Sequence, residues 1–177
     1  MSPEPPINVY ISQDDEKYRI QHDTLQSIVI KILNKLDVFS GNIDLSFVTS
    51  ATMLGLCKKY MQKEYATDVL SFPQEDLNLL SEKKPLLLGE KTLGDVVICL
   101  DTARENSKKI GQPLEREVTF LTLHGILHLL GHDHIEEEER TRMRTEEKRV
   151  MADLLKQKPW TGMVQQLSPE QAGVTHA

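Results

Sequence analysis

Short apolar segments separated by polar ones predict the strands of this chain. In residues 7–12, apolar and polar side chains alternate, so that Ile7, Val9 and Ile11 would share one buried face. Residues 93–100 are apolar almost throughout, which predicts a strand buried on both faces. The predicted strands are residues 7–12, 43–48, 68–72 and 93–100.

Apolar residues recur every three or four positions between these strands, as expected of helices with one buried face. Residues 115–130 are apolar almost all round, so this helix should lie deep in the core and end at Gly131 in a left-handed conformation. The predicted helices are residues 24–36, 51–62, 102–111, 115–130 and 135–156, the first three capped by Asp23 or Thr24, by Ser50, and by Asp101 or Thr102.

Helices separate most of the strands, which predicts one small α/β or mixed α+β domain. We expect a mostly parallel four-stranded sheet packed against about five helices, with a turn at Gly41 and Asn42 and a long polar connection over residues 74–92. The domain should span residues 1–156. Residues 157–177 are polar and contain proline and glycine, which predicts a loosely ordered tail.

Composition narrows the classes of function. The net charge of −6 argues against sequence-independent nucleic-acid binding over the whole surface, although a local basic cleft is compatible with it. On charge alone, the lysines near position 60 and the basic residues 104–109 would be solvated helix faces. We expect no membrane span and no signal peptide. Two distant cysteines in 177 residues favour a reducing compartment, so we expect the protein in the cytoplasm.

Four of the six histidines lie within residues 124–134, where the sequence is HGILHLLGHDH. His124 and His128 are four positions apart on a predicted helix, so their rings lie one turn apart on the same face. Gly131 permits a sharp exit from the helix, and His134 can then return toward the same point. Three neutral nitrogen ligands with an open fourth position are typical of a catalytic zinc site, so we expect one Zn²⁺ ion.

Two residues next to the three histidines allow more than one interpretation. His132 follows the glycine directly, where the chain turns. It could be a fourth ligand, but we expect it either to be exposed or to contact one of the ligands without binding the metal itself. Asp133 is a candidate catalytic residue or a hydrogen-bond partner of a ligand imidazole, and equally a carboxylate that turns the loop. Imidazole also suits nickel, copper and iron, so the spacing predicts a metal more firmly than it predicts which metal.

The spacing of the three histidines and the glycine matches the zincin pattern H-E-x-x-H-x-x-G-x-x-H of metzincin proteases. In those enzymes the glutamate is the general base of peptide hydrolysis. Here Gly125 occupies its position. An ordinary protease is therefore disfavoured, unless a carboxylate from elsewhere in the chain replaces the glutamate.

The motif H-G-x-L-H-L-x-G-x-D-H also resembles the signature of the YbeY family of endoribonucleases. Residues 67–73, TDVLSFP, resemble the family's T-D/N-V-L-S-F-P strand, and residues 93–98, LGDVVI, resemble its L-G-D-I/V-V-I strand. Glu117 and the apolar residues after it resemble the run into the histidine helix. The resemblance covers roughly residues 7–155, judged by motif order and spacing.

This resemblance implies a zinc site at His124, His128 and His134 and a metal-dependent RNase specific for single strands, acting in ribosomal RNA maturation and ribosome quality control. It implies ribosomal RNA, the small ribosomal subunit and ribosome-associated proteins as partners. Many members carry an arginine, thought to bind RNA, where this chain has Met61.

A groove flanked by the basic segments would place the RNA backbone, and its predicted contacts are Lys59, Lys63, Arg104 and Lys108. Either water or the 2′-hydroxyl of RNA could be the nucleophile. Two alternatives remain. One is a metalloprotease-like zinc hydrolase. The other is a ribosome-assembly factor whose metal is mainly structural, and the missing arginine leaves this alternative open.

Overall fold

The computed structural model describes residues 6–74, 79–80 and 83–172. A four-stranded sheet with strand order β1-β3-β5-β4 forms its centre. β1 pairs parallel with β3 and β3 parallel with β5, whereas β4 runs antiparallel to β5. This confirms the predicted mostly parallel sheet. The strands are β1 (Ile7–Gln13), β2 (Tyr18–Ile20), β3 (Val38–Val48), β4 (Val69–Pro73), β5 (Leu86–Cys99) and β6 (Val164–Gln166).

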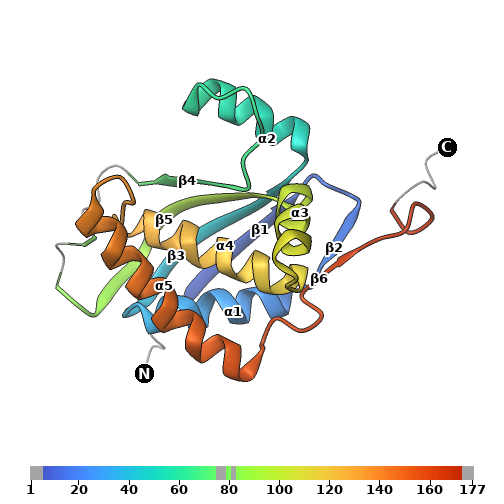
Figure 1. Cartoon of the computed structure of the whole chain (residues 1–177). Coiled ribbons are helices and arrows are strands. Elements are labelled where there is room, and N and C mark those ends of the chain that lie inside the picture. Colours follow the sequence, from blue (N-terminus) through green and yellow to red (C-terminus); the bar gives the residue numbers. More distant parts are fainter. Residues whose placement is uncertain (1–5, 75–78, 81–82, 173–177) are drawn as a thin grey trace.

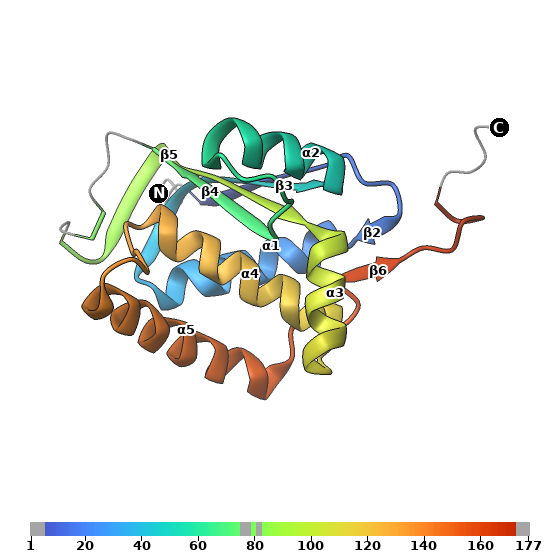
Figure 2. The same ribbon diagram turned by 45° about the horizontal axis from the view of Figure 1, so that its top comes forward.

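Helices cover both faces of the sheet, as Figure 2 shows. One face carries α1 and α4, with α5 packed outside them, and the other carries α2 and the short π-helix η1 (Figures 1 and 2). In the described residues the helices are α1 (His22–Lys35), α2 (Ser50–Leu56), η1 (Cys57–Met61), α3 (Leu100–Ile110), α4 (Leu114–Leu129) and α5 (Glu137–Gln157). None of them is long and apolar enough to cross a membrane.

The core has two parts because side chains of β5 alternate between the two faces of the sheet. Leu93, Val96 and Ile98 belong to the large cluster beneath α1 and α4. Val97 and Cys99 belong to a smaller cluster beneath α2 and η1. All five are buried, which confirms the prediction of a strand covered on both sides.

Two predicted features of the sheet are wrong. Gly41 and Asn42 lie inside β3 and form no turn, because they pair with Ile7 and Asn8 of β1. The register between β3 and β5 shifts there, and Gly41 takes φ +137°. The polar connection is also shorter than expected, because β5 begins at Leu86. Part of that segment, residues 75–78 and 81–82, lies outside the described residues.

The predicted helix caps are also corrected. The first residue before α1 is Gln21, and the one before α3 is Cys99; neither side chain caps its helix. Thr49 caps α2, because its side chain accepts a hydrogen bond from the backbone N–H of Thr52. The chain leaves η1 at Gln62, which adopts a left-handed conformation with φ 53°.

The expectation of a loosely ordered tail is wrong for its first part. Trp160 and Met163 are buried, and β6 pairs antiparallel with β2 in a second, two-stranded sheet. The backbone N–H of Gln21 donates to the carbonyl of Met163 over 2.8 Å. The sequence pattern failed because one tryptophan and one methionine anchor an otherwise polar segment. Residues 173–177 lie outside the described part of the chain.

Candidate metal centre

The helix α4 positions two of the three predicted ligands. It begins after Pro113, and acidic side chains occupy its first turn, where the helix dipole favours negative charge. Most of its remaining side chains are buried, and His124 and His128 are half-buried. The helix is therefore held firmly by its apolar neighbours, and its two histidines occupy one side of it.

The exit from α4 brings the third histidine back. Gly131 takes φ +105°, and the backbone N–H of His132 donates to the carbonyl of Leu127 over 3.0 Å. This confirms a left-handed glycine at the end of the helix. Asp133 then turns the chain, because its Oδ1 accepts the backbone N–H groups of His134 at 2.6 Å and Ile135 at 3.2 Å.

Ring nitrogens of the three histidines converge on one point. Nε2 of His128 lies 3.2 Å from Nε2 of His124 and 3.2 Å from Nδ1 of His134. One ring nitrogen from each residue lies within 4.8 Å of the others. Tetrahedral zinc with bonds of about 2.05 Å would separate its nitrogen ligands by roughly 3.3 Å. The donor set therefore fits a zinc-sized ion.

Electrostatics keep the His128 ring able to bind a cation. Burial, together with the neighbouring His124 and His134, lowers the pKa of His128 to about 4, so the ring is neutral at neutral pH. On the far side of His124, Nδ1 lies 3.2 Å from Oε2 of Glu147 in α5. A proton on Nδ1 donated to this carboxylate leaves the lone pair on Nε2, which faces the other histidines.

At Gly125, β4 and β5 approach α4 closely. A Cβ atom there would lie 2.6 Å from Cγ1 of Val96 and 3.2 Å from Oγ of Ser71. The Ser71 hydroxyl also donates to the carbonyl of Gly125 over 3.0 Å. The position of the metzincin glutamate is therefore occupied by the sheet, and no side chain larger than hydrogen fits without movement.

The three histidines form one wall of a cavity of about 350 Å³. Its other walls come from β4, the residues before it and the end of η1, and they include Met61, Lys63 and Asp68. Asp68 is held by Asn106 of α3, whose side-chain amide donates to Oδ2 over 3.0 Å. A ligand entering this cavity would meet the metal centre and one lysine.

The other predicted substrate contacts lie outside the lining of this cavity. The Lys59 ammonium lies over the ring of Tyr60, 5.1 Å from its centre. Arg104 and Lys108 lie on α3, where Lys108 is exposed and Arg104 half-buried. His132 is half-buried and is not part of the histidine cluster.

Sequence reasoning missed Glu147 as a partner of the metal centre. The signal was present, since Glu147 lies four positions after Met143 and three before Val150, on the inward face of α5. Its side chain is only 11 % exposed. A carboxylate on a buried helix face needs a partner, and here that partner is His124.

Comparisons with known proteins agree with this geometry. The family model of endoribonuclease YbeY matches residues 10–155. The endoribonuclease YbeY of Caldicellulosiruptor saccharolyticus is 36 % identical over 158 residues, which cover 82 % of this chain and 96 % of the relative. The endoribonuclease YbeY of Carboxydothermus hydrogenoformans is 44 % identical over 115 residues, covering 65 % of this chain and 73 % of the relative.

A solved structure shares the fold. The solution structure of TM1509 from Thermotoga maritima aligns with a TM-score of 0.52 at 19 % identity, covering 85 % of this chain and 94 % of that one. The matched family model spans most of the chain and includes all three converging histidines. The resemblance seen in the motifs is confirmed: this chain belongs to the YbeY family of endoribonucleases.

Proposed function

We propose that this protein is a zinc-dependent endoribonuclease that cleaves single-stranded ribosomal RNA at the three-histidine centre. The observation that carries the proposal is the convergence of three imidazole nitrogens, two pairs of them 3.2 Å apart, on the wall of an open cavity. Membership of a family of endoribonucleases supplies the class of reaction.

His124, His128 and His134 would hold one zinc ion. When bound, the ion would supply Lewis-acid polarisation of a phosphoryl oxygen or of an attacking water. The chain's own contribution is to present three neutral nitrogens on a rigid helix and a glycine-permitted turn. Glu147 orients His124 by accepting a hydrogen bond from its Nδ1–H group.

Lys63 is the basic side chain in the lining of the cavity, and we propose that it contacts a phosphate next to the scissile bond. Lys59, Arg104 and Lys108 would contact the RNA backbone farther out. Each such contact that is removed should weaken binding to all sequences alike and reduce the salt dependence of binding by about one counterion.

Of the roles that its place in the motif allows for Asp133, we propose the one that turns the loop. Its carboxylate accepts two backbone N–H groups and so holds the turn that returns His134. We infer that it acts by shaping this turn, and that Asp133→Asn, which keeps one oxygen acceptor, would retain more activity than Asp133→Ala.

We propose that the catalytic residues lie within residues 1–156 and that the segment from Trp160 to β6 serves the fold. A cytoplasmic protein acting on the small ribosomal subunit, with ribosome-associated proteins as partners, would be consistent with this function. Both cysteines are free and buried, as expected in a reducing compartment.

Gly125 argues against a peptidase, because the sheet occupies the space that a glutamate would need. A mainly structural metal is disfavoured for a different reason. The three histidines lie at the edge of the apolar core and line a cavity that is open to solvent. Structural zinc sites are instead typically closed by four ligands and contribute folding energy directly.

The test is elemental analysis of the purified protein beside a cleavage assay on single-stranded RNA from the small ribosomal subunit, with and without chelator. We expect His124→Ala to lose both bound zinc and cleavage, while the exposed His22 provides a matched control, His22→Ala, that keeps both. Cleavage that survives in His124→Ala would refute the proposal. Unfolding on chelation, with no cleavage at any zinc concentration, would instead support a structural metal.

A further inference from the structure

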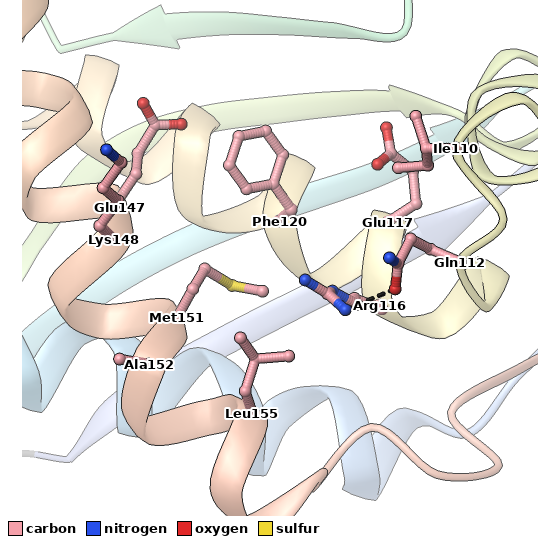
Figure 3. A pocket seen from close by; sticks show the side chains of 10 residues that line it. All are labelled: Ile110, Gln112, Arg116, Glu117, Phe120, Glu147, Lys148, Met151, Ala152 and Leu155. Atoms are coloured by element: carbon pink, nitrogen blue, oxygen red, sulfur yellow. Dashed lines mark hydrogen bonds between the residues drawn. The ribbon is translucent and has the colours of Figure 1, made fainter.

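A second cavity lies behind the metal centre, between α4, α5 and the end of α3 (Figure 3). Its volume is about 420 Å³, within the range typical of small-ligand sites. Its apolar lining includes Phe120, Met151, Leu155 and Ile110. Ile110 is 60 % exposed at the mouth. None of the predicted site residues lies in it.

A smaller cavity lies between this one and the metal centre and shares part of its lining. This smaller cavity, of about 310 Å³, is lined by His124 and His134 and also by Phe120 and Glu147. Phe120 and Glu147 line the larger cavity as well. The ring centres of Phe120 and His124 are 6.1 Å apart. The larger cavity therefore adjoins the histidines, within reach of a neighbouring nucleotide of a strand bound there.

The charges around the cavity balance. Arg116 and Lys148 oppose Glu117 and Glu147, and the Arg116 guanidinium donates to the side-chain oxygen of Gln112 (Figure 3). Balanced charge gives no net attraction for a phosphate or for a strongly charged peptide. An aromatic ring with apolar neighbours and polar groups at the rim instead suits a flat, neutral group that has hydrogen-bonding edges.

We propose that this cavity binds one nucleobase of the RNA strand whose backbone lies at the three histidines. The base would stack on Phe120, and its edge would meet the polar groups around Glu147 and Gln112. Bases are recognised in this way on aromatic side chains of proteins that bind single-stranded RNA. The inference rests on the proposed function in one respect, namely that the bound base belongs to an RNA substrate.

Binding of the base is tested without catalysis. The zinc-loaded protein, labelled at methionine, isoleucine and alanine methyl groups, is titrated with each of the four nucleosides and followed by NMR. We expect the methyl resonances of Met151 and Ile110 to shift with at least one nucleoside. Ala152 is exposed at the cavity wall, so Ala152→Phe should fill the cavity and abolish the shifts.

The matched control is Ala51→Phe, the same substitution at an exposed position of α2. It should leave the shifts unchanged. Cavity resonances that do not respond to any nucleoside at millimolar concentration would overturn the proposal, and so would shifts that survive in Ala152→Phe. Binding of an apolar peptide there, with no nucleoside effect, would mean that the cavity serves a protein partner.

The second measurement uses RNA substrates in which single bases near the cleavage site are removed one at a time, leaving the sugar and phosphate. Loss of the bound base should slow cleavage roughly 5- to 150-fold, the range of stacking on one aromatic side chain. In Phe120→Leu, which keeps apolar bulk but lacks the aromatic face, intact and base-free substrates should be cleaved at similar rates.

The two experiments separate the two proposals. If the protein cleaves RNA and removal of each base is harmless, the cavity proposal fails while the proposed function stands. If it cleaves no RNA, the proposed function fails, and the nucleoside titration alone decides whether the cavity binds bases.

Discussion

Glu147 contacts one of the three histidines of the metal centre although it lies outside the histidine motif. Its Oε2 lies 3.2 Å from Nδ1 of His124, and its side chain is almost buried, so little solvent reaches this contact. Loss of such a carboxylate partner typically lowers metal affinity about 10- to 100-fold. We expect Glu147→Ala to weaken zinc binding by that factor, measured by competition with a zinc-binding indicator.

The conservative variant separates orientation from charge. Glu147→Gln keeps an oxygen that can accept a hydrogen bond from Nδ1–H of His124, so its zinc affinity should lie between those of wild type and Glu147→Ala. Glu146→Gln is the control, because Glu146 pairs with Arg149 on the surface of α5 and does not contact a histidine. Equal zinc affinity in wild type and Glu147→Ala would contradict this role.

Gly125 gives a second prediction at this scale. Adding a methyl group against Val96 overpacks the contact between α4 and β5, and overpacking costs about 1–3 kcal/mol. Alanine gains about 0.5–1 kcal/mol over glycine in a helix, so we expect Gly125→Ala to lower the free energy of unfolding by up to roughly 2.5 kcal/mol, measured by urea denaturation. It should also weaken zinc binding, since the helix that carries His124 and His128 must move.

Gly55 of α2 is the matched control, because a Cβ there meets nothing within 4 Å. Glycine in a helix costs about 0.5–1 kcal/mol relative to alanine, so Gly55→Ala should stabilise the protein slightly. If Gly125→Ala were equally harmless, the sheet would not be what excludes a side chain from this position. Val96→Ala combined with Gly125→Ala should recover part of the loss.

At the scale of elements, the sequence predicted most helices and strands because their apolar periods are long and regular. It predicted α4 well, since sixteen residues with a glycine just beyond allow few alternatives. It failed at Gly41, because a glycine inside a strand and a glycine in a turn look alike until the partner strand is known. Likewise, Leu86 begins β5 because it pairs with Val38 of β3, and that pairing partner cannot be identified from the sequence around Leu86.

The candidate site was predictable to the extent that it is local in sequence. Three histidines within eleven residues share a helix and its turn, so spacing alone brings them together. Lys63, two residues after the end of η1, and Glu147 of α5 reach the site across tertiary contacts that no local spacing encodes. The basic residues of α3 were expected in the same groove, and the structure places them outside the cavity lining.

Asp101 joins three elements and gives a prediction that depends on pH. Its carboxylate accepts hydrogen bonds from Lys17 and Tyr18 at 2.7 Å each, and from Ser50 at 3.3 Å. Burial alone would raise its pKa, but the hydrogen bonds from Lys17 and Tyr18 outweigh burial and hold the pKa below its usual value of 3.8. The ionised form is therefore the one that stabilises the fold.

We expect Asp101→Asn to lower the free energy of unfolding by about 1–3 kcal/mol at pH 7. Because the folded pKa lies below the unfolded one, the stabilisation is present above pH 3.8 and is lost as the pH falls through the folded value. Denaturation from pH 7 to pH 2 should show the two proteins converging in acid. Asp153→Asn, at an exposed pair with Lys35, should show a smaller difference.

At the scale of the whole molecule, the sheet divides the protein into two unequal layers. The large core packs beneath α1 and α4, whereas α2 and η1 cover a small cluster on the other face. The histidine cavity lies between these layers, with walls from α4, η1 and β4. Because the site is assembled from both layers, its geometry depends on the stability of the whole fold.

The segment after α5 contributes to the stability of the fold. Trp160 is 4 % exposed and Met163 is fully buried, and β6 covers the edge of β2. The backbone N–H of Leu167 also donates to the carbonyl of Lys17 over 2.8 Å. Burial of each large apolar side chain contributes about 1.5–3 kcal/mol, offset by the entropy of ordering the segment.

We therefore expect a chain that ends after Gln157 to lose roughly 2–5 kcal/mol of unfolding free energy, measured by urea denaturation. A chain that ends after Leu167 keeps Trp160 and β6 and should match the full-length protein. Zinc affinity should stay near the wild-type value in both, because the three histidines and Glu147 lie before the truncations. Equal stability of all three chains would show that the packed segment adds nothing to the fold.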